Sequence, residues 1–490
     1  MKRAIGAPRA PARPIRLAIA GIGAALACAP GALAQSPRDT LSYDVTVSLA
    51  PPHVAVRAML TVSESGSVVL VGPPSARVAG TEVTGFFATD SRGDRLPVER
   101  SGTRFIIEAA PSTILYRYRL DFENAVATSS TSAGLDSARL YAAGRSLFLA
   151  PDPLAYRKTS VPYPLVRVRI AAPSTWHVVT SWGVDDPVFD PPGGDALLGA
   201  TIAAAPDFRI HRDSAAGTRF VLAVRGDRHF GDSALIGVIA ASLRLAAGAL
   251  GPVPVPLVTY TSDVGRKGRT SGSLQGPSSV GLIWEPGDLL ERARGEDVFH
   301  ETLHLWFGGA METDRWWTEG VTDYYAARLY AEWTAQPSDL AALCYQSLQD
   351  YQDIRHNTLL TMDQEERSNI PGDNTALLVY RKGMLAGLLL DAAIRRGTEG
   401  RATLDSAARR LLAMAAERRT HVVTGSEIRD AVTGVGGDDV ARIWDRVVDG
   451  ATLISADEVR DALRIVTGTD VAPSQPRAKE AKVLSNHPKP

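Results

Sequence analysis

The sequence predicts an α+β multidomain protein in which an N-terminal antiparallel β domain precedes a mixed α/β segment and a helical C-terminal part. From residue 41 to about 211, apolar residues alternate with polar ones, as in half-buried strands. After residues 213–217, short β runs alternate with helical patterns, and after Gly295 nearly every segment has apolar residues at three-to-four spacing. With 45% apolar and 22% charged residues, the composition excludes a collagen-like, low-complexity or wholly disordered chain.

The first 34 residues have the form of a secretory signal peptide. A cationic segment is followed by the apolar run Leu17 to Ala27 and by a small-residue cleavage site that ends at Ala34. The run is short, and no later stretch offers about 18 uncharged apolar residues, so we expect no membrane span in the mature chain. The sequence therefore predicts export to the periplasm or outside the cell, with lipoprotein anchoring through Cys28 as the alternative.

Charge and cysteine content narrow the function classes further. The 53 Lys and Arg are balanced by 54 Asp and Glu, and the leader contains basic residues but no acid. No basic excess therefore indicates nucleic-acid binding. Once the leader is removed, Cys344 is the only cysteine, so we expect no internal disulfide and stability through packing alone.

We expect three consecutive parts after the leader. The N-terminal β-rich domain covers 35–215, the second domain covers 216–470, and a disordered tail covers 471–490. Within the second domain, an α/β part (216–310) precedes a helical part (311–470). The expected strands of the α/β part are 218–224, 255–261 and 280–284. The expected helices are 233–250, 322–334, 375–396, 403–418, 426–432, 438–448 and 455–466. Gly383, Gly397 and Gly450 are candidate helix breaks or caps.

The sequence His-Glu-Thr-Leu-His at 300–304 carries a zinc-binding pattern. On a helix, His300 and His304 lie one turn apart on the same face, so two imidazole nitrogens can reach a single zinc ion. Glu301 sits beside them, where it can accept a proton from an attacking water molecule. The opposite face is apolar and is expected to pack, with the glycines at 308–309 ending the helix.

A hydrolytic zinc site needs a third protein ligand and an open position. No histidine occurs between His304 and His356, so the third ligand is expected to be an acid. Glu319 is favoured, because a helix that starts near Trp316 carries it in the first turn. The other candidate acids are Glu312, Asp314, Asp323 and Glu332.

Two more residues could support such a site. Asp323 follows Glu319 by one helical turn and can accept the outer N–H of a zinc-bound histidine, which fixes its tautomer and raises its basicity. Tyr380 precedes a strongly apolar helix, and its hydroxyl could donate a hydrogen bond to an oxyanion. Taken by itself, a tyrosine in this position is more often a buried helix residue.

The order of these motifs resembles the gluzincin metallopeptidases. The resemblance rests on the 300–304 motif, on W-W-T-E-G-V-T-D-Y-Y-A from Trp316, and on Y-R-K-G from Tyr380 followed by M-L-A-G-L-L-L-D-A-A-I-R-R. It is similar to the glycyl-aminopeptidase family in particular, and more distantly to aminopeptidase N and thermolysin. This resemblance implies a thermolysin-like catalytic domain over 216–470, with Glu319 as the third zinc ligand and Tyr380 stabilising the transition state.

Three features depart from the relatives. The interval from His304 to Glu319 is shorter than in aminopeptidase N relatives, which favours the glycyl-aminopeptidase family. That family's PDZ-like domain is not expected, because only about 40 residues follow Gly450. Gly272 and Gln275 lie where the relatives bind the substrate's free amine with an acid, and here the acid position holds Gln275. A neutral amide offers no charge to an ammonium group, so exopeptidase activity does not follow from the resemblance.

These observations predict an exported metallopeptidase that hydrolyses peptide bonds in peptide or protein substrates with one Zn²⁺ per chain. Glu301 is the expected general base, and aminopeptidase and endopeptidase activity both remain open. One alternative is a catalytically idle peptide-binding protein that keeps the fold, which the intact Glu301 opposes. Another is an aminopeptidase N-like enzyme that trims free N-termini, which Gln275 and the short interval after His304 oppose.

Overall fold

The structure is a computed structural model that describes residues 40–61, 66–71, 81–110, 113–122, 133–151, 165–264, 271–274, 278–284, 293–352, 375–418 and 421–471. These residues belong to one compact unit, Arg38–Pro490. The expected leader with Cys28, the substrate-binding candidate Gln275 and the expected tail from residue 472 lie outside the described residues.

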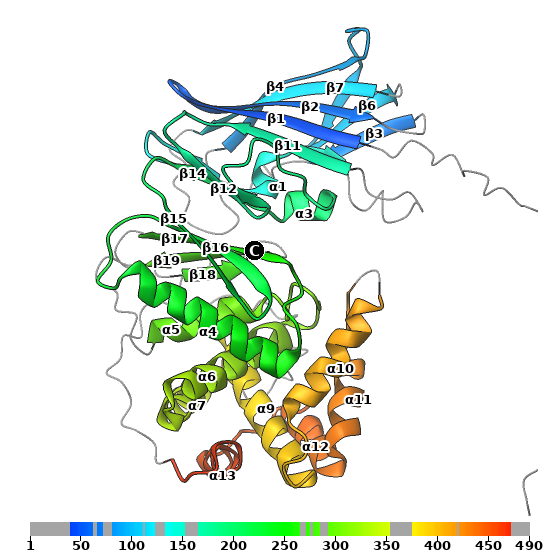
Figure 1. The fold of residues 1–490 in the computed structure, drawn as a ribbon. Coiled ribbons are helices and arrows are strands. Elements are labelled where there is room, and N and C mark those ends of the chain that lie inside the picture. Colours follow the sequence, from blue (N-terminus) through cyan, green and yellow to red (C-terminus); the bar gives the residue numbers. More distant parts are fainter. Residues whose placement is uncertain are drawn as a thin grey trace, which may run out of the picture. The chain divides into compact units, whose positions relative to one another are not determined.

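Three sheets form the N-terminal β region (Figure 1). Period-two burial of β1, β2 and β7 confirms the alternation seen in the sequence. Their inner faces share one apolar core with residues of the other two sheets. In sheet order, the strands are β11 (Leu165–Ala171), β1 (Thr40–Leu49), β2 (Pro52–Thr61), β7 (Thr113–Phe122) and β4 (Thr81–Asp90); β10 (Ala150–Pro151), β3 (Gly66–Val71), β6 (Arg104–Ala110) and β5 (Val98–Ser101); and β13 (Gly183–Val184), β12 (His177–Thr180), β14 (Thr201–Ala205), β9 (Leu140–Ala143) and β8 (Ala133–Leu135). Two short helices, α1 (Gly144–Leu147) and α3 (Gly194–Leu198), accompany them.

A fourth sheet opens the second region, in the order β15 (Arg209–Ala215), β16 (Thr218–Val224), β17 (Leu257–Val264), β19 (Ser279–Trp284) and β18 (Ser271–Leu274). The strands β16, β17 and β19 are parallel. The predicted boundary at 215–216 falls in the tight turn between the paired strands β15 and β16. Parallel neighbours need a crossover, which α4 (Asp232–Leu250) supplies between β16 and β17.

Helix α4 lies along this sheet (Figure 1). By length and composition alone it could cross a membrane, but 56% of its most apolar window is buried inside the protein. Its residues Leu235, Val238 and Ile239 are buried in the same core as the sheet. Burial therefore accounts for its apolar character.

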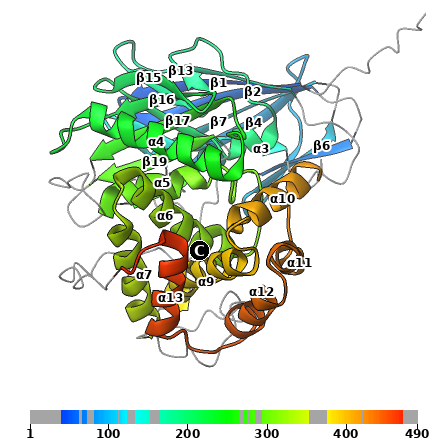
Figure 2. The ribbon, with the colours of Figure 1, turned by 60° about the horizontal axis from the view of Figure 1, so that its bottom comes forward.

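Most of the described residues after β19 are helical, and the expected helical segments are found close to their predicted bounds. Figure 2 shows α9 in the middle of this part, with α7 and α13 on one side and α10 to α12 on the other. The elements are α5 (Ala293–Leu303), the π-helical turn η1 (Trp316–Val321), α6 (Thr322–Thr334), α7 (Pro337–Gln352), α9 (Thr375–Gly397), α10 (Leu404–Ala416), α11 (Gly425–Gly436), α12 (Asp438–Ile443), the π-helical turn η2 (Trp444–Val448) and α13 (Ala456–Thr467).

The prediction that Gly383 breaks or caps a helix is wrong, because Gly383 lies inside α9. A Cβ on Gly383 would stand 2.7 Å from the carbonyl oxygen of Trp316 and 2.8 Å from Cα of Gly320. The glycine is therefore required by the close approach of η1 to α9. This contact places the two segments that carry Glu319 and Tyr380 side by side.

Candidate metal centre

Helix α5 has one packed side and one polar side. Val298, Phe299 and Leu303 are fully buried in the core of the second region. The buried Thr302 hydroxyl lies 3.1 Å from the Ser242 hydroxyl and 3.0 Å from that of Tyr260. These contacts fix α5 against α4 and β17, so His300 and His304 are held on its other side.

The helix ends at Leu303, earlier than the predicted stop at the glycine pair. The N–H of His304 still donates to the carbonyl of His300 at 3.3 Å, so the one-turn relation of the two histidines is kept. Gly308 has a φ of +102°, and its N–H donates to the carbonyl of Met311 at 2.7 Å. Gly308 therefore adopts its positive φ to form the turn after α5, and it does not end the helix.

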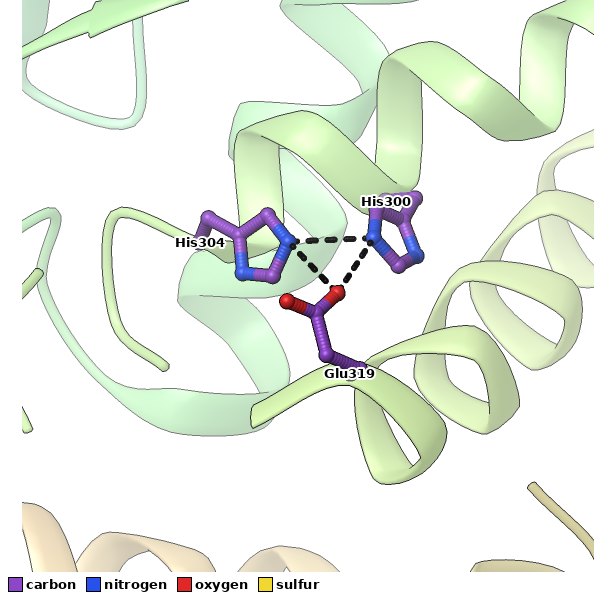
Figure 3. A group of neighbouring side chains, drawn as sticks. All are labelled: His300, His304 and Glu319. Atoms are coloured by element: carbon purple, nitrogen blue, oxygen red, sulfur yellow. Dashed lines mark hydrogen bonds and ion pairs between the residues drawn. The ribbon is translucent and has the colours of Figure 1, made fainter. Parts of the chain in front are cut away.

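His300, His304 and Glu319 converge on one point (Figure 3). The Nε2 atoms of the two histidines are 3.0 Å apart, and each lies 3.6 Å from Oε2 of Glu319. The carboxylate comes from η1, a π-helical turn that runs directly into α6. In the part of the chain that the structure describes, no other set of three acidic, histidine or cysteine side chains is close enough to share a metal ion.

The hydrogen bonds of the two imidazoles show where their protons are. Nδ1 of His304 lies 2.9 Å from the carbonyl oxygen of Phe307, which can only accept, and Nδ1 of His300 lies 2.8 Å from Oδ1 of Asp323. Both Nδ1 atoms therefore donate, so each ring in its neutral form offers the lone pair of Nε2 to a metal.

This donor set fits zinc. Two lone pairs and a carboxylate oxygen at this spacing repel one another unless a proton or a metal cation lies between them. Zinc–ligand bonds of about 2.0–2.1 Å in a tetrahedron separate the ligand atoms by about 3.3 Å. The separations of 3.0 and 3.6 Å lie on either side of that value.

The surroundings of Glu319 favour its ionised form, which is the form that can bind a metal ion. Burial opposes its charge, but the adjacent imidazoles of His300 and His304 hold the pKa of this carboxyl well below its usual value. Burial also opposes the charged form of His300, yet the hydrogen bond and charge of Asp323 raise the pKa of His300 well above its usual value. Glu319 is therefore ionised, as a carboxylate that binds a metal must be.

Asp323 lies on the outer side of His300, beside its Nδ1 atom. Its other oxygen, Oδ2, lies 4.0 Å from Nη1 of Arg381 on α9, and Nε of Arg381 lies 3.3 Å from Oδ2 of Asp350 on α7. Sequence reasoning missed Arg381 and Asp350. The available signal was the charge of Arg381 at the start of an apolar helix, where a half-buried guanidinium needs a partner.

Glu301 is 9% exposed, on the same helix as the two histidines. Burial raises the pKa of Glu301, while the nearby charges of His300 and His304 lower it and that of Glu319 raises it. Glu301 is thus a buried carboxyl beside the three converging atoms, not one of them.

Tyr380 lies half-buried on α9, and its hydroxyl faces the charge of Glu319. Burial, followed by the charges of Glu319 and Asp323, raises the pKa of Tyr380 well above its usual value. The hydroxyl therefore stays protonated and remains a donor next to the candidate metal ligands.

Of the remaining candidates, those that the structure describes are not among the three converging residues. Gly272 lies in β18, the edge strand of the second-region sheet, and pairs with Leu282 of β19. Gln275 lies outside the described residues. The backbone N–H of Glu312 donates to the carbonyl oxygen of His421. Glu312 therefore lies in the connection between α5 and η1. Glu319 is the acid that joins the two histidines, and the candidate acids that do not are Glu312, Asp314, Asp323 and Glu332.

Solved structures with this fold include zinc metallopeptidases. An aminopeptidase N family protein from Idiomarina loihiensis matches with a TM-score of 0.73 at 17% identity, over 86% of this chain and 78% of that chain. An M1 zinc metallopeptidase from Deinococcus radiodurans matches with a TM-score of 0.58 at 16% identity, over 85% and 95%. A variant of the Deinococcus enzyme bound to a Tyr-Ser-Ala substrate matches with a TM-score of 0.55 at 16% identity, over the same shares.

No family model and no curated protein sequence matches the chain. At identities this low, the likeness to solved structures establishes the fold. The predicted α+β class is confirmed: β sheets precede a helical region, as in two-domain M1 zinc metallopeptidases.

Proposed function

We propose that this protein is a zinc-dependent metallopeptidase that hydrolyses peptide bonds. The observation that carries the proposal is the convergence of two Nε2 atoms and the Glu319 carboxylate, with both Nδ1 atoms bound to acceptors on the outer side. The fold agrees with it, and similar structures hold a Tyr-Ser-Ala substrate or L-arginine.

Each residue near the centre has a distinct part in the proposed reaction. His300, His304 and Glu319 would hold the metal, and Asp323 keeps His300 in the required tautomer. The chemistry that bound Zn²⁺ supplies is acidification of a water molecule and polarisation of the substrate carbonyl. Glu301 takes the proton of the attacking water and gives it to the leaving amine. Tyr380 keeps its proton and donates it as a hydrogen bond to the oxygen that becomes negative in the transition state.

The finer assignments rest on the sequence. The motifs resemble the glycyl-aminopeptidase family, and the neutral Gln275 at its amine-binding position favours an enzyme that does not require a free N-terminus. The cationic and apolar leader favours export to the periplasm or beyond. A catalytically idle peptide-binding protein is the competing function, and the retained Glu301 opposes it.

The test is hydrolysis of a peptide mixture by the purified protein, followed by mass spectrometry. We expect cleavage that stops when a chelator removes the metal and returns when zinc is added. Retained peptide binding without cleavage by the zinc-loaded protein would favour the idle binder. The positions of the cuts would distinguish N-terminal trimming from internal cleavage.

A further inference from the structure

The outer face of the sheet β11-β1-β2-β7-β4 carries a row of residues with three arginines and one acid. Strand register places Arg169 opposite Asp44, Asp44 opposite Arg57, and Arg57 opposite Arg117. The row continues to Phe87 of β4, which stands opposite Arg117. The neighbours of these residues along each strand, such as Tyr43, Val56 and Tyr116, point to the other face and are buried.

Arg57 and Arg117 are exposed and lie directly opposite each other on adjacent strands. Like charges in this relation destabilise a sheet. Arg169 pairs with Asp44 at 3.5 Å, and Arg119 pairs with Asp121. Arg57 and Arg117 have no ion pair with any residue that the structure describes. An anionic ligand would relieve their mutual repulsion.

Phe87 extends the positive row. The guanidinium carbon of Arg117 lies 5.1 Å from the centre of the Phe87 ring, and that of Arg95 lies 5.2 Å from it. Two arginines therefore share one aromatic ring, which holds both in place while their remaining N–H groups stay available. The row thus presents several ordered guanidinium groups along one line across the sheet.

Exposed aliphatic side chains lie next to the row on the same face. Met59 and Leu115 stand opposite each other, one pleat from Arg57 and Arg117, and are 41% and 39% exposed. Leu165 at the start of β11 is 56% exposed. These are three of the seven large apolar side chains that stand exposed among the described residues. The sheet face is therefore amphipathic, with an aliphatic strip beside a cationic one.

We propose that this face binds the surface of a membrane that contains anionic lipids. The arginines would bind lipid phosphates, and Met59, Leu115 and Leu165 would enter the interfacial layer. A second copy of the chain is a poorer occupant, because face-to-face pairing would bring arginine rows together. A nucleic acid would satisfy the arginines, but its phosphate backbone offers no apolar contact for the aliphatic strip. This inference does not depend on the proposed peptidase activity.

The test is cosedimentation of the purified protein with vesicles of phosphatidylcholine alone or mixed with phosphatidylglycerol. We expect binding only to the mixed vesicles, weakening as salt is raised. The double variant Arg57→Gln, Arg117→Gln should bind about tenfold or more weakly. It should remain folded in a thermal melt, because it removes a like-charge pair. Met59→Ser, Leu115→Ser should also weaken binding but keep the preference for phosphatidylglycerol.

The matched control is Arg212→Gln, Arg219→Gln, which removes the same charge from exposed positions on β15 and β16. It should leave vesicle binding unchanged. Equal loss in both double variants would show that only net charge matters and would overturn the proposal. Absence of vesicle binding by the unmodified protein would overturn it as well. So would binding to a labelled DNA duplex that is tighter than vesicle binding and lost in the Arg57, Arg117 variant.

Discussion

Gly320 and Gly383 meet backbone to backbone where η1 crosses α9. A Cβ on Gly320 would stand 2.5 Å from Cα of Gly383 and 2.5 Å from the carbonyl oxygen of Val379. The contact aligns the segment that supplies Glu319 with the helix that supplies Tyr380. The geometry of the candidate centre therefore depends on two residues that have no functional groups.

Gly383→Ala should destabilise the protein by about 1–3 kcal/mol and weaken zinc binding, because the added methyl group pushes η1 away from α9. The matched control is Gly237→Ala in α4, where a Cβ meets nothing within 4 Å. That variant should be neutral or more stable by up to about 1 kcal/mol. Urea unfolding of both variants measures the difference. Equal stability of the two would show that the crossing tolerates a side chain.

Glu319→Ala and Asp323→Asn separate the two acids that face His300. Glu319→Ala removes a proposed ligand and should abolish stoichiometric zinc binding. Asp323→Asn only weakens the orientation of His300, and should lower zinc affinity by about 10–100-fold. Competition with a zinc-binding dye ranks the two variants. If Asp323→Asn lost more affinity than Glu319→Ala, the proposed ligand would be Asp323 instead.

Tyr380→Phe should lower kcat by roughly 100–1000-fold with little change in KM, because its hydroxyl acts as negative charge develops. Zinc content should stay near that of the unmodified protein. Tyr345→Phe on α7 is the control, since that half-exposed ring lies outside the proposed centre. Normal turnover by Tyr380→Phe would leave this tyrosine with a packing role only.

Gln275 bears on the choice between blocked and free N-termini. Because a neutral amide gives no charge-assisted bond to an ammonium group, acetylated and free peptides should be cleaved at comparable rates. Gln275→Glu should shift kcat/KM toward the free amine. The unmodified enzyme could instead show a ratio of kcat/KM for free over acetylated peptides above about 100-fold, near 2.7 kcal/mol. That result would mean that another acid binds the N-terminal ammonium group.

Local sequence signals predicted much of the fold. Period-two burial in β1, β2 and β7 and the apolar spacing of helices such as α6 follow directly from side-chain periodicity. Gly383 was misread, because its need for glycine comes from a segment some sixty residues away, which sequence spacing cannot reveal. The end of α5 was placed too late for a related reason, since Gly308 serves a later turn.

The candidate centre was predictable where its residues lie close in sequence. The spacing of His300 and His304 is set by one helical turn, and the placing of Glu319 and Asp323 by the next helix. The link from Asp323 through Arg381 to Asp350 joins three different helices. Arg381 stands out in the sequence only as a charge beside an apolar helix, and Asp350 looks like an ordinary surface group, so only tertiary packing shows which residues meet.

The most direct test of the central claim is a zinc titration of chelator-treated protein, with peptide hydrolysis and bound metal measured on the same samples. For the unmodified chain, activity should rise in proportion to bound zinc and level off at one ion per chain. Glu301→Gln should bind zinc to the same level and show almost no turnover, because it keeps the ligands and loses the base. Full activity in the chelator-treated protein, or zinc loss in Glu301→Gln equal to that in His304→Ala, would contradict the account.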